Sequence, residues 1–416
     1  MGERWPVNKQ TVSNSQIIVG LEIGTSKVCV AVGEVSENQV VNIIGLGQAK
    51  SRGVRKGEII DVALAEEDVR NAIVEAEQVA DVEIRSVFLG VTGSHIRGFN
   101  NTGVHPVVSA DREITTTDIQ DVIKNAKAIN LPTDHSVIHV IRQHFRVDGQ
   151  DGVLNPEGML GAKVEVDVHV VSGRYNRLQN PIRLVSGLHL EVENISFSAL
   201  ASSLAILSTE QKELGTLVID LGAGVTEYAV YSAGVIKHTG VLAVGGDHVS
   251  NDLAYGLKVP LARAEQLKID HGSAVIDPEA GDREIDLSDD SLIPGRQVNL
   301  GHMQKIMSMR LQETFELIAR DIGQAGLIEY LRAGVVLCGG GARIPHITRL
   351  ARDVFNLPVA IGRASTVSGI KNALDEPEFA TPVGLIKFGV FQSQANPRRA
   401  GFGRAIRRQV AALFGR

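Results

Sequence analysis

A glycine turn between two apolar runs, present twice in the chain, constrains the fold more than any other feature of the sequence. Leu217–Tyr231 reads LVIDLGAGVTEYAVY, in which an apolar run ends at Asp220, a Gly-Ala-Gly turn follows and a second apolar run leaves it. Ile17–Val35 has the same layout about 200 residues earlier, with Glu22 in the place of Asp220. The repeat predicts two β-hairpins on duplicated halves of the chain that face one cleft.

The hairpin tips carry groups that suit a phosphate. Gly222 and Gly224 permit a positive φ and bring backbone N–H groups close to phosphoryl oxygens, while Asp220 is placed to hold Mg²⁺. In the first hairpin, Thr25–Lys27 add two hydroxyls and a cation. A single hairpin of this kind is more often a plain turn, and Lys27 on its own is more often a solvated charge.

A third glycine turn strengthens the interpretation. Gly334–Ile344, GVVLCGGGARI, predicts a buried strand, three glycines and a helix that begins near Pro345. The VGGD at Val244–Asp247 precedes a predicted helix that ends near Leu257. Each turn is a weak signal alone, but the ordered set predicts that the chain binds an ATP-type nucleotide.

Composition places the chain among cytoplasmic proteins. Cys29 and Cys338 lie inside apolar runs, so we expect buried thiols rather than a disulfide or a thiolate metal site. Met1–Gln16 lacks the apolar core of a secretory signal, and no apolar run reaches the roughly 18 residues that a membrane-spanning helix needs.

Residues 87–170 are predicted to form an inserted β-α-β-β subdomain. Its predicted elements are a strand at Ser86–Gly93, a helix at Thr117–Ile129 with a capping box at Thr117 and Gln120, and strands at Val137–Val147 and Lys163–Val171. Strand spacing does not bring His135, His139 and His144 together, so a metal site is not expected there. Without catalytic groups, the insert is predicted to be an interaction surface.

Further elements are predicted from helical spacing and composition. Helices are expected at Tyr175–Leu188, at the small-residue segment Ala199–Leu207, and at Met303–Ile322. The core positions of the last are predicted to be Ile306, Met309, Phe315, Leu317 and Ile318, with Arg310 facing outward. Asp277–Pro294 is acidic and is predicted to be a solvated surface segment.

The glycine turns resemble the actin, heat-shock chaperone and sugar kinase superfamily, whose duplicated lobes close on ATP. Within it, GLEIGTSKV, the SRG-x-x-KG at Ser51–Gly57, the NPEGMLG at Asn155–Gly161 followed by KVEVDVHVV, and the basic tail resemble the FtsA family of actin-like bacterial cell-division proteins. The resemblance runs from about Ile17 to Phe388 and resumes at the tail. It implies an α/β fold with actin-like, duplicated ribonuclease H-like domains in two lobes and an FtsA-type insert.

The resemblance also implies roles for individual residues. Those expected to bind the ATP phosphates are Gly24, Thr25, Ser26, Lys27, Gly222, Ala223 and Gly224. Those expected around ribose and adenine are Gly245, Gly246, Glu265, Lys268, Gly339, Gly340, Gly341 and Arg343. Asp220 and Glu22 are expected near Mg²⁺, and Arg310 matches the helix arginine that contacts the C-terminal tail of the tubulin-like FtsZ. For Glu265 and Lys268, at i, i+3 spacing, a surface ion pair is the alternative.

Departures from the superfamily pattern concern catalysis. Val225 stands where the chaperones carry Thr, although Thr226 is adjacent, and Glu22 replaces the usual Asp. Residues 195–207 contain no Glu or Gln to orient an attacking water. We therefore expect at most a slow ATPase, in which ATP is a conformational and assembly ligand, and no catalytic residue is assigned.

The C-terminal segment is predicted to bind membranes. The net charge is −6, yet Arg398–Arg416 holds six arginines and no acid, so nucleic acid is not an expected partner of the acidic body and an anionic membrane surface is an expected partner of the tail. One helical face is apolar and the other basic, which predicts an amphipathic helix. Its membrane-binding residues would be Phe402, Arg404, Ile406, Arg407, Arg408, Val410, Leu413 and Phe414. A helix docked on its own domain is the alternative.

These predictions give a domain organisation. It comprises a disordered extension (1–16), a first-lobe ATPase core (17–86 and 171–196), the insert (87–170), a second-lobe core (197–235 and 304–390), a small FtsZ-binding subdomain (236–303), a linker (391–400) and the amphipathic helix (401–416).

The function implied by the resemblance is that of an ATP-binding adaptor. It would self-assemble into actin-like filaments, tether the FtsZ ring to the cytoplasmic face of the membrane at the septum, and help recruit later division proteins. One alternative is a pilus-assembly adaptor of the same superfamily. Another is a small-molecule kinase, but that needs an Asp base beside a substrate pocket, and the sequence offers no candidate outside the nucleotide residues.

Overall fold

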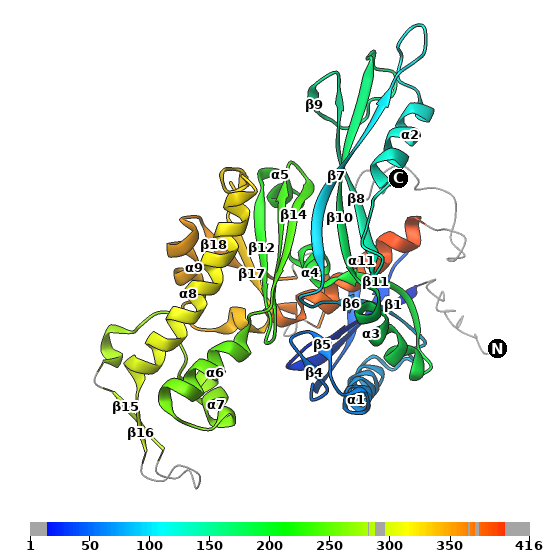
Figure 1. Ribbon diagram of the computed structural model, residues 1–416. Coiled ribbons are helices and arrows are strands. Elements are labelled where there is room, and N and C mark those ends of the chain that lie inside the picture. The colour runs from blue at the N-terminus through cyan, green and yellow to red at the C-terminus, as the bar shows by residue number, and fades with distance from the viewer. Residues whose placement is uncertain (1–14, 282, 288–295, 365–366, 371–373, 396–416) are drawn as a thin grey trace, which may run out of the picture.

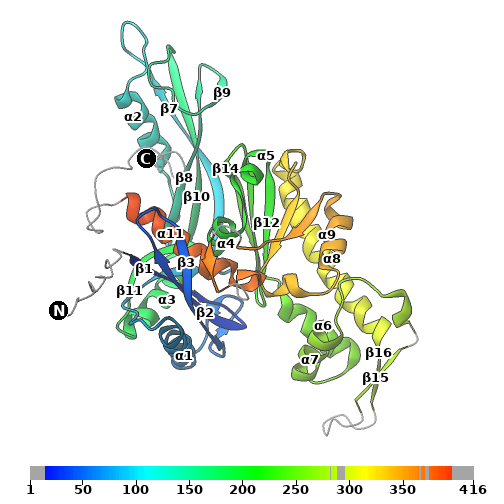
Figure 2. The ribbon, with the colours of Figure 1, turned by 180° about the vertical axis from the view of Figure 1, so that it is seen from behind.

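The computed structural model describes residues 15–281, 283–287, 296–364, 367–370 and 374–395. Two α/β lobes lie side by side, a smaller sheet projects from the first lobe, and helices α4 (Ser198–Ile206) and α11 (Ala380–Ala395) run between the lobes (Figure 1). Figure 2 shows the same arrangement from behind, with α11 against the first-lobe sheet.

The two lobes have sheets of the same topology. The first sheet runs β11-β6-β1-β2-β3-β19, and the second runs β14-β13-β12-β17-β18. In each, three consecutive antiparallel strands are followed by two that join in parallel, β6 and β11 in one lobe and β17 and β18 in the other. The duplication predicted from the hairpins therefore extends to both sheets.

The bounds of the first-lobe strands are β1 (Gln16–Ile23), β2 (Lys27–Val35), β3 (Val41–Lys50), β6 (Ser86–Val91), β11 (Glu191–Phe197) and β19 (Ser368–Gly369). Those of the second lobe are β12 (Thr216–Leu221), β13 (Thr226–Ser232), β14 (Val235–Leu242), β17 (Val335–Cys338) and β18 (Val359–Ile361). Short elements complete the lobes: β4 (Val54–Arg55), β5 (Glu58–Ile59), α3 (Tyr175–Gly187), α5 (Thr209–Leu214), η2 (Ile328–Tyr330), η3 (Gly340–Arg343) and η4 (Pro377–Phe379).

The central strands are mostly apolar because both faces of each sheet are covered, and their acids lie near the hairpin turns. In β12, Val218 packs toward α4 and α11, whereas Leu217 and Ile219 pack toward α8 (Leu300–Gln324) and α9 (Ile347–Phe355) on the other face. The first sheet has α11 on one face and α1 (Val62–Ala80) on the other. Cys29 and Cys338 are buried free thiols, as predicted.

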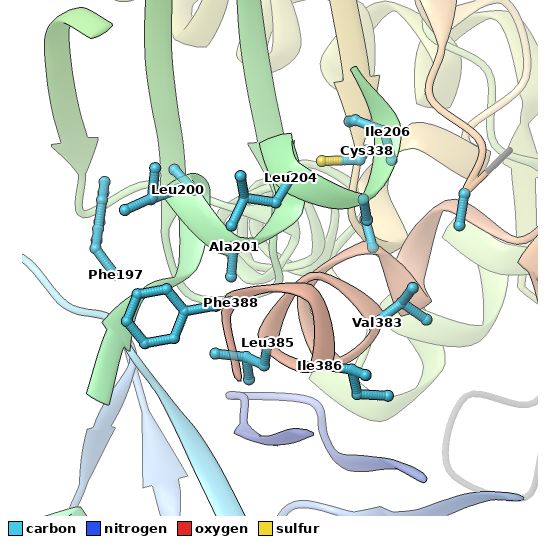
Figure 3. Close-up of a cluster of buried hydrophobic side chains, with 14 of the residues drawn as sticks. Phe197, Leu200, Ala201, Leu204, Ile206, Cys338, Val383, Leu385, Ile386 and Phe388 are labelled. Carbon is cyan, nitrogen blue, oxygen red and sulfur yellow. The ribbon is translucent and has the colours of Figure 1, made fainter. Parts of the chain in front are cut away.

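Helices α4 and α11 form a shared core between the lobes. Figure 3 shows Leu200, Ala201 and Leu204 of α4 above Leu385 and Phe388 of α11. The helices approach so closely that a Cβ on Gly384 would lie 1.8 Å from the Ala201 carbonyl oxygen. The small residues of α4 therefore permit the close backbone contact that its composition suggests.

The insert is a second, smaller sheet of order β7-β10-β8-β9, covered by α2 (Thr116–Lys127). Its strands are β7 (Arg97–Pro106), β8 (His135–Val147), β9 (Gln150–Val153) and β10 (Lys163–Arg174). The predicted first strand, Ser86–Gly93, is wrong for the insert, because β6 pairs with β1 in the first-lobe sheet. The first strand of the insert is β7, which was not predicted because its residues are mostly polar. Strand β9 was not predicted either. The capping box is also displaced, to Thr115 and Asp118.

A buried polar network joins the insert to the second lobe. His169 of β10 contacts the Thr239 hydroxyl of β14 through Nε2 at 2.8 Å and the Asn100 side chain through Nδ1 at 2.8 Å. Gln143 donates to the Ile236 carbonyl at 2.8 Å. His139 accepts from the Phe197 amide at 3.0 Å, and the described residues contain no cluster of three or more His, Cys, Asp or Glu side chains that could hold a metal.

A small subdomain extends the second lobe. It contains α6 (Gly246–Leu257), α7 (Leu261–His271), η1 (Pro278–Ala280), β15 (Glu284–Asp286) and β16 (Gln297–Asn299). Three predicted details need correction. Residue 236 lies inside β14 and so does not separate the subdomain from the core; α11 continues through residues 391–395 of the predicted linker; and Met309 of α8 is 63% exposed because it lies on the outer face of the helix.

Candidate functional site

A cavity of about 500 Å³ lies between the two lobes and is lined by both glycine hairpins. The predicted residues that line it are Glu22, Gly24, Thr25, Ser26, Lys27, Asp220, Gly222, Ala223, Gly224, Gly246, Glu265, Lys268, Gly339, Gly340, Gly341 and Arg343. Gly245 does not line it, because the α6 N-terminus packs it under the hairpin tip, where a Cβ would lie 2.5 Å from the Ala223 carbonyl oxygen.

The two hairpins have the same turn geometry. The Gly24 amide donates to the Lys27 carbonyl at 3.0 Å, and the Gly222 amide donates to the Val225 carbonyl at 3.1 Å. The prediction that Gly222 and Gly224 adopt a positive φ is wrong, since neither does. Glycine is needed for space instead: a Cβ on Gly222 would lie 2.7 Å from the Val225 carbonyl oxygen.

The hairpin tips meet across the floor of the cavity. A Cβ on Gly224 would lie 2.4 Å from the Thr25 hydroxyl oxygen and 2.7 Å from the Lys56 Cα. The Thr25 hydroxyl accepts a hydrogen bond from the Gly57 amide at 2.9 Å, which fixes the SRG-x-x-KG segment beside the first hairpin. Movement of one lobe relative to the other therefore changes the contact between the two tips.

The acidic groups of the cavity suit a divalent cation. Asp220 accepts hydrogen bonds from the Ser202 hydroxyl at 2.9 Å and the Thr381 hydroxyl at 3.1 Å. Burial, reinforced by Asp220, raises the pKa of Glu22 to about 8, and burial also raises the pKa of Asp220. A bound Mg²⁺ would supply the positive charge that these two carboxylates lack, so they fit the predicted metal role.

Glu265 and Lys268 form the ion pair that their spacing suggested, at 2.7 Å, and the pair faces the cavity rather than solvent alone. The Lys268 ammonium also donates to the Gly246 carbonyl at 3.3 Å and the Ser250 hydroxyl at 3.0 Å, and Ser250 donates to Glu265. These bonds fix α7 against the start of α6, so they form a polar part of the cavity lining.

Glu378, which sequence analysis missed, joins the two lobes. Its carboxylate lies 2.6 Å from the Arg343 guanidinium and 3.7 Å from the Lys27 ammonium. Burial alone would raise the pKa of Glu378, but Lys27 and Arg343 outweigh it and lower the pKa. Lys27 also lies over the Phe379 ring at 4.6 Å. An anion in the cavity would compete with Glu378 for both cations.

Other residues at the cavity were missed for identifiable reasons. Thr381 belongs to α11, which begins directly after Phe379 as α4 begins directly after Phe197, but these short segments share only the Phe and gave no recognisable motif. Glu227 is a buried acid on the same face of β13 as the core residues Ala229 and Tyr231. An acid in the apolar alternation of a strand is a sequence pattern that could have indicated a functional residue. Thr92, outside any predicted motif, gives no such signal.

The residues at the tip of the second hairpin have distinct roles. Val225 lines the cavity, whereas the Thr226 hydroxyl donates to the Val244 carbonyl at 2.8 Å. Thr226 therefore stabilises the loop before α6 and does not replace the chaperone Thr at position 225.

Arg310 lies away from the cavity, on α8. Its guanidinium bonds the Asp252 carboxylate at 2.5 Å and also pairs with Glu313, so the prediction that it faces outward is only partly right. Its side chain is 28% exposed and sits between α8 and α6. The predicted membrane-binding residues at 402–414 lie outside the described residues. Within the described residues, no helix has the length and apolar character needed to cross a bilayer.

Comparison with known families matches two parts of the chain. The family described as "Cell division protein FtsA" matches residues 217–384, and "SHS2 domain inserted in FTSA" matches residues 93–172. The second match covers the β7–β10 sheet and α2, so the inserted subdomain is of the SHS2 type.

Relatives match over nearly the whole length. Cell division protein FtsA of Pseudomonas aeruginosa is 35% identical over 380 residues, which are 91% of this chain and 91% of that protein. The FtsA of Borreliella burgdorferi is 37% identical over 391 residues, covering 91% of this chain and 92% of that protein. The FtsA of Escherichia coli K12 is 34% identical over 384 residues, or 91% of each chain.

Solved structures show the actin-like fold at low sequence identity. The "PilM-PilN type IV pilus biogenesis complex" aligns with a TM-score of 0.61 and 18% identity, covering 90% of this chain and 98% of that one. MreB5 of Spiroplasma citri bound to ADP aligns with a TM-score of 0.55 and 14% identity, covering 93% and 99%. A structure of MreB5 bound to AMPPNP aligns with a TM-score of 0.54.

Proposed function

The chain belongs to the FtsA family of cell-division proteins, and from that premise we propose that it binds ATP and Mg²⁺ between its lobes and uses the bound nucleotide to control its own assembly. The observation that carries the proposal is the cavity in which two duplicated hairpins meet. The predicted phosphate, nucleoside and Mg²⁺ residues, apart from Gly245, line this one space. The actin-like MreB5 structures, one with ADP and one with AMPPNP, support a nucleotide as its ligand.

Each wall of the cavity has a role in this proposal. The hairpin tips at Gly24–Lys27 and Gly222–Gly224 would hold the phosphates, and Lys27 would exchange Glu378 for a phosphoryl oxygen. Asp220 and Glu22 would hold Mg²⁺, which neutralises phosphate charge. Because the walls belong to different lobes, ATP would favour one lobe arrangement over others.

At the cellular level, we propose an adaptor that self-assembles and tethers the FtsZ ring to the cytoplasmic face of the membrane at the septum, where it helps recruit later division proteins. Arg310 would contact the FtsZ C-terminal tail, and the segment 401–416 would bind anionic lipid. The pilus-assembly alternative has less support, because the PilM likeness is 18% identical and indicates the fold alone, whereas the FtsA relatives reach 37%.

Calorimetry of the full chain with ATP, with and without Mg²⁺, tests nucleotide binding. We expect saturable Mg²⁺-dependent binding, and the substitution Asp220→Asn should weaken it about tenfold or more, since it removes a charge-assisted contact to the cation. With EDTA present, the variant should bind ATP no more weakly than the wild-type chain, because the contact through Mg²⁺ is then absent from both. Absence of ATP binding to the wild-type chain would contradict the proposal.

A further inference from the structure

A third carboxylate, Glu227, lies in the same cavity and has no role in nucleotide or Mg²⁺ binding as proposed above. It stands three residues after Gly224 of the second hairpin tip and is directly opposite Asp220 in the β12–β13 ladder. Opposed residues of an antiparallel pair project from the same face, so both carboxylates point toward the cleft. Glu227 is only 3% exposed.

The duplicated hairpin shows that this second acid is not required by the turn. In the first hairpin, the position opposite Glu22 is occupied by Cys29. Like charges directly opposite each other destabilise a sheet, and burial, together with Asp220 and Glu22, raises the pKa of Glu227 well above its ordinary value. Among the described residues, no ion pair offsets this charge. A neutral side chain would serve stability better, so the acid calls for a chemical explanation.

A hydrogen bond across the lobes fixes the orientation of Glu227. The Thr92 hydroxyl donates to its Oε1 at 2.6 Å. Thr92 directly follows β6, whose Gly90 is paired with Glu22 of β1, so the bond links the second hairpin to the strand beside the first. The Gly93 backbone N–H also hydrogen-bonds this carboxylate, so Thr92 and Gly93 together hold it in place. An ionised carboxylate has about four acceptor positions, which leaves capacity for a group in the cavity that Glu227 lines.

From these observations we propose that Glu227 orients the water that attacks the terminal phosphate of bound ATP, with Thr92 as its positioning residue. The inference rests on the proposed ATP-binding function. The water oxygen forms a bond to the γ-phosphorus, the bond from that phosphorus to the β–γ bridging oxygen breaks, ADP leaves with the electron pair, and the water proton ends on the released phosphate. Glu227 takes the place of the acid or amide that α4 lacks, because α4 contains only small and aliphatic side chains.

The substitution Glu227→Gln distinguishes water orientation from two other roles, a purely structural hydrogen bond and a Mg²⁺ ligand. The Gln carbonyl oxygen still accepts from Thr92, so a purely structural hydrogen bond is retained. The amide nitrogen then replaces the other oxygen, and because it can only donate, the variant has fewer positions that accept a hydrogen bond from water. If Glu227 were a Mg²⁺ ligand instead, the variant would lose ATP affinity rather than rate.

The experiment compares full-length variants by single-turnover hydrolysis at saturating Mg²⁺-ATP, by ATP affinity and by the midpoint of thermal unfolding. Glu227→Gln should slow hydrolysis by about 100-fold or more, with ATP affinity within about threefold and an unfolding midpoint no lower than that of the wild type. Thr92→Val should also slow hydrolysis, and Thr92→Ser, which keeps the hydroxyl, should restore it.

Glu193→Gln is the matched control. Glu193 of β11 accepts a 2.6 Å hydrogen bond from the Ser86 hydroxyl at the start of β6, and it does not line the cavity. The control should therefore leave the hydrolysis rate, the ATP affinity and the unfolding midpoint unchanged. The inference would be overturned if Glu227→Gln hydrolysed ATP as fast as the wild-type chain. It would also be overturned if the variant had the wild-type rate at saturating ATP and differed only in weaker ATP binding. A wild-type chain that binds ATP without hydrolysing it would also overturn it while leaving the proposed function intact; a chain that does not bind ATP would remove both.

Discussion

Glu22, Asp220 and Glu227 line the same cavity, and none of them belongs to a described ion pair. Burial is the first cause that raises the pKa of each carboxyl group. Three desolvated carboxylates in one cavity cost folding free energy when they are ionised without a cation. These acids therefore lower the stability of the ligand-free chain, and a phosphate-bound Mg²⁺ would offset that loss. Acids with perturbed pKa values are common at functional sites.

The pKa of Glu22 predicts how stability depends on pH. The folded value is about 8 and the reference value is 4.5, so between these values the folded chain holds a proton that the unfolded chain releases. The free energy of unfolding should fall as pH rises through this window, by up to about 1.4 kcal/mol per pH unit. Urea unfolding of the ligand-free chain at several pH values measures the slope.

Glu22→Gln should flatten this dependence, because the amide does not titrate, whereas Glu37→Gln at an exposed position should leave the slope unchanged. A slope of the same size in the Glu22 variant would show that other groups produce it. Added Mg²⁺-ATP should stabilise the wild-type chain most toward the upper end of the window, since protons compete with the cation for the carboxylate.

Sequence analysis predicted those cavity-lining residues that stand in recognisable turns and missed those brought to the cavity by packing. Gly24–Lys27 and Gly222–Gly224 were identified because a strand, a turn and a strand are contiguous in sequence. Thr92 and Glu378 reach the cavity only because strands and helices from distant segments meet there. The reason for glycine at 222 was also misjudged: close approach of the Val225 carbonyl, rather than φ, requires it.

At the scale of elements, contacts between helix backbones determine how the lobes are joined. Helix α11 crosses α4 at Gly384, and the side chains that surround the contact come from both lobes (Figure 3). Neither helix has strong amphipathic patterning, because each is buried on most sides. The same burial explains why sequence periodicity predicted α8, as Met303–Ile322, but predicted no helix at α11, whose last residues fall within the predicted linker at 391–400.

Gly384→Ala should weaken this crossing. The added methyl would lie 1.8 Å from the Ala201 carbonyl oxygen, so the helices must separate, and we expect a loss of about 1–3 kcal/mol of unfolding free energy. The control is Gly187→Ala in α3, where an added Cβ has no neighbour within 4 Å. That change should be neutral or slightly stabilising. Chemical denaturation of both variants measures the difference, and equal midpoints would show that the helix contact is not limiting.

At the scale of the whole molecule, the duplication places one hairpin and one crossing helix in each lobe, so the cavity and the helical core lie on the same boundary. The insert contacts this boundary from above, through His169 to β14 and through His139 to Phe197. A change of lobe arrangement would therefore reach the insert. The proposed partners, lipid at one end and FtsZ at the small subdomain, would then bind a molecule whose shape depends on its nucleotide.

Co-sedimentation with anionic liposomes tests that combination. The wild-type chain should bind liposomes and bring FtsZ with it, more strongly with ATP, because several tails on one assembly bind multivalently. The double substitution Phe402→Glu with Phe414→Glu should abolish liposome binding but retain ATP binding, since it removes apolar anchors and adds repulsion from the lipid. Arg310→Glu should keep liposome binding and lose FtsZ.

The two variants separate the tether from the adaptor. If the tail variant still sediments with liposomes, residues 402–414 are not the anchor, and another part of the chain must be. If Arg310→Glu still recruits FtsZ, the contact lies elsewhere than between α6 and α8, where Arg310 is held by Asp252. Asp252→Asn then gives a further check: it frees Arg310 from its partner, so FtsZ recruitment should persist if the arginine itself makes the contact and fall if the ion pair only shapes the surface.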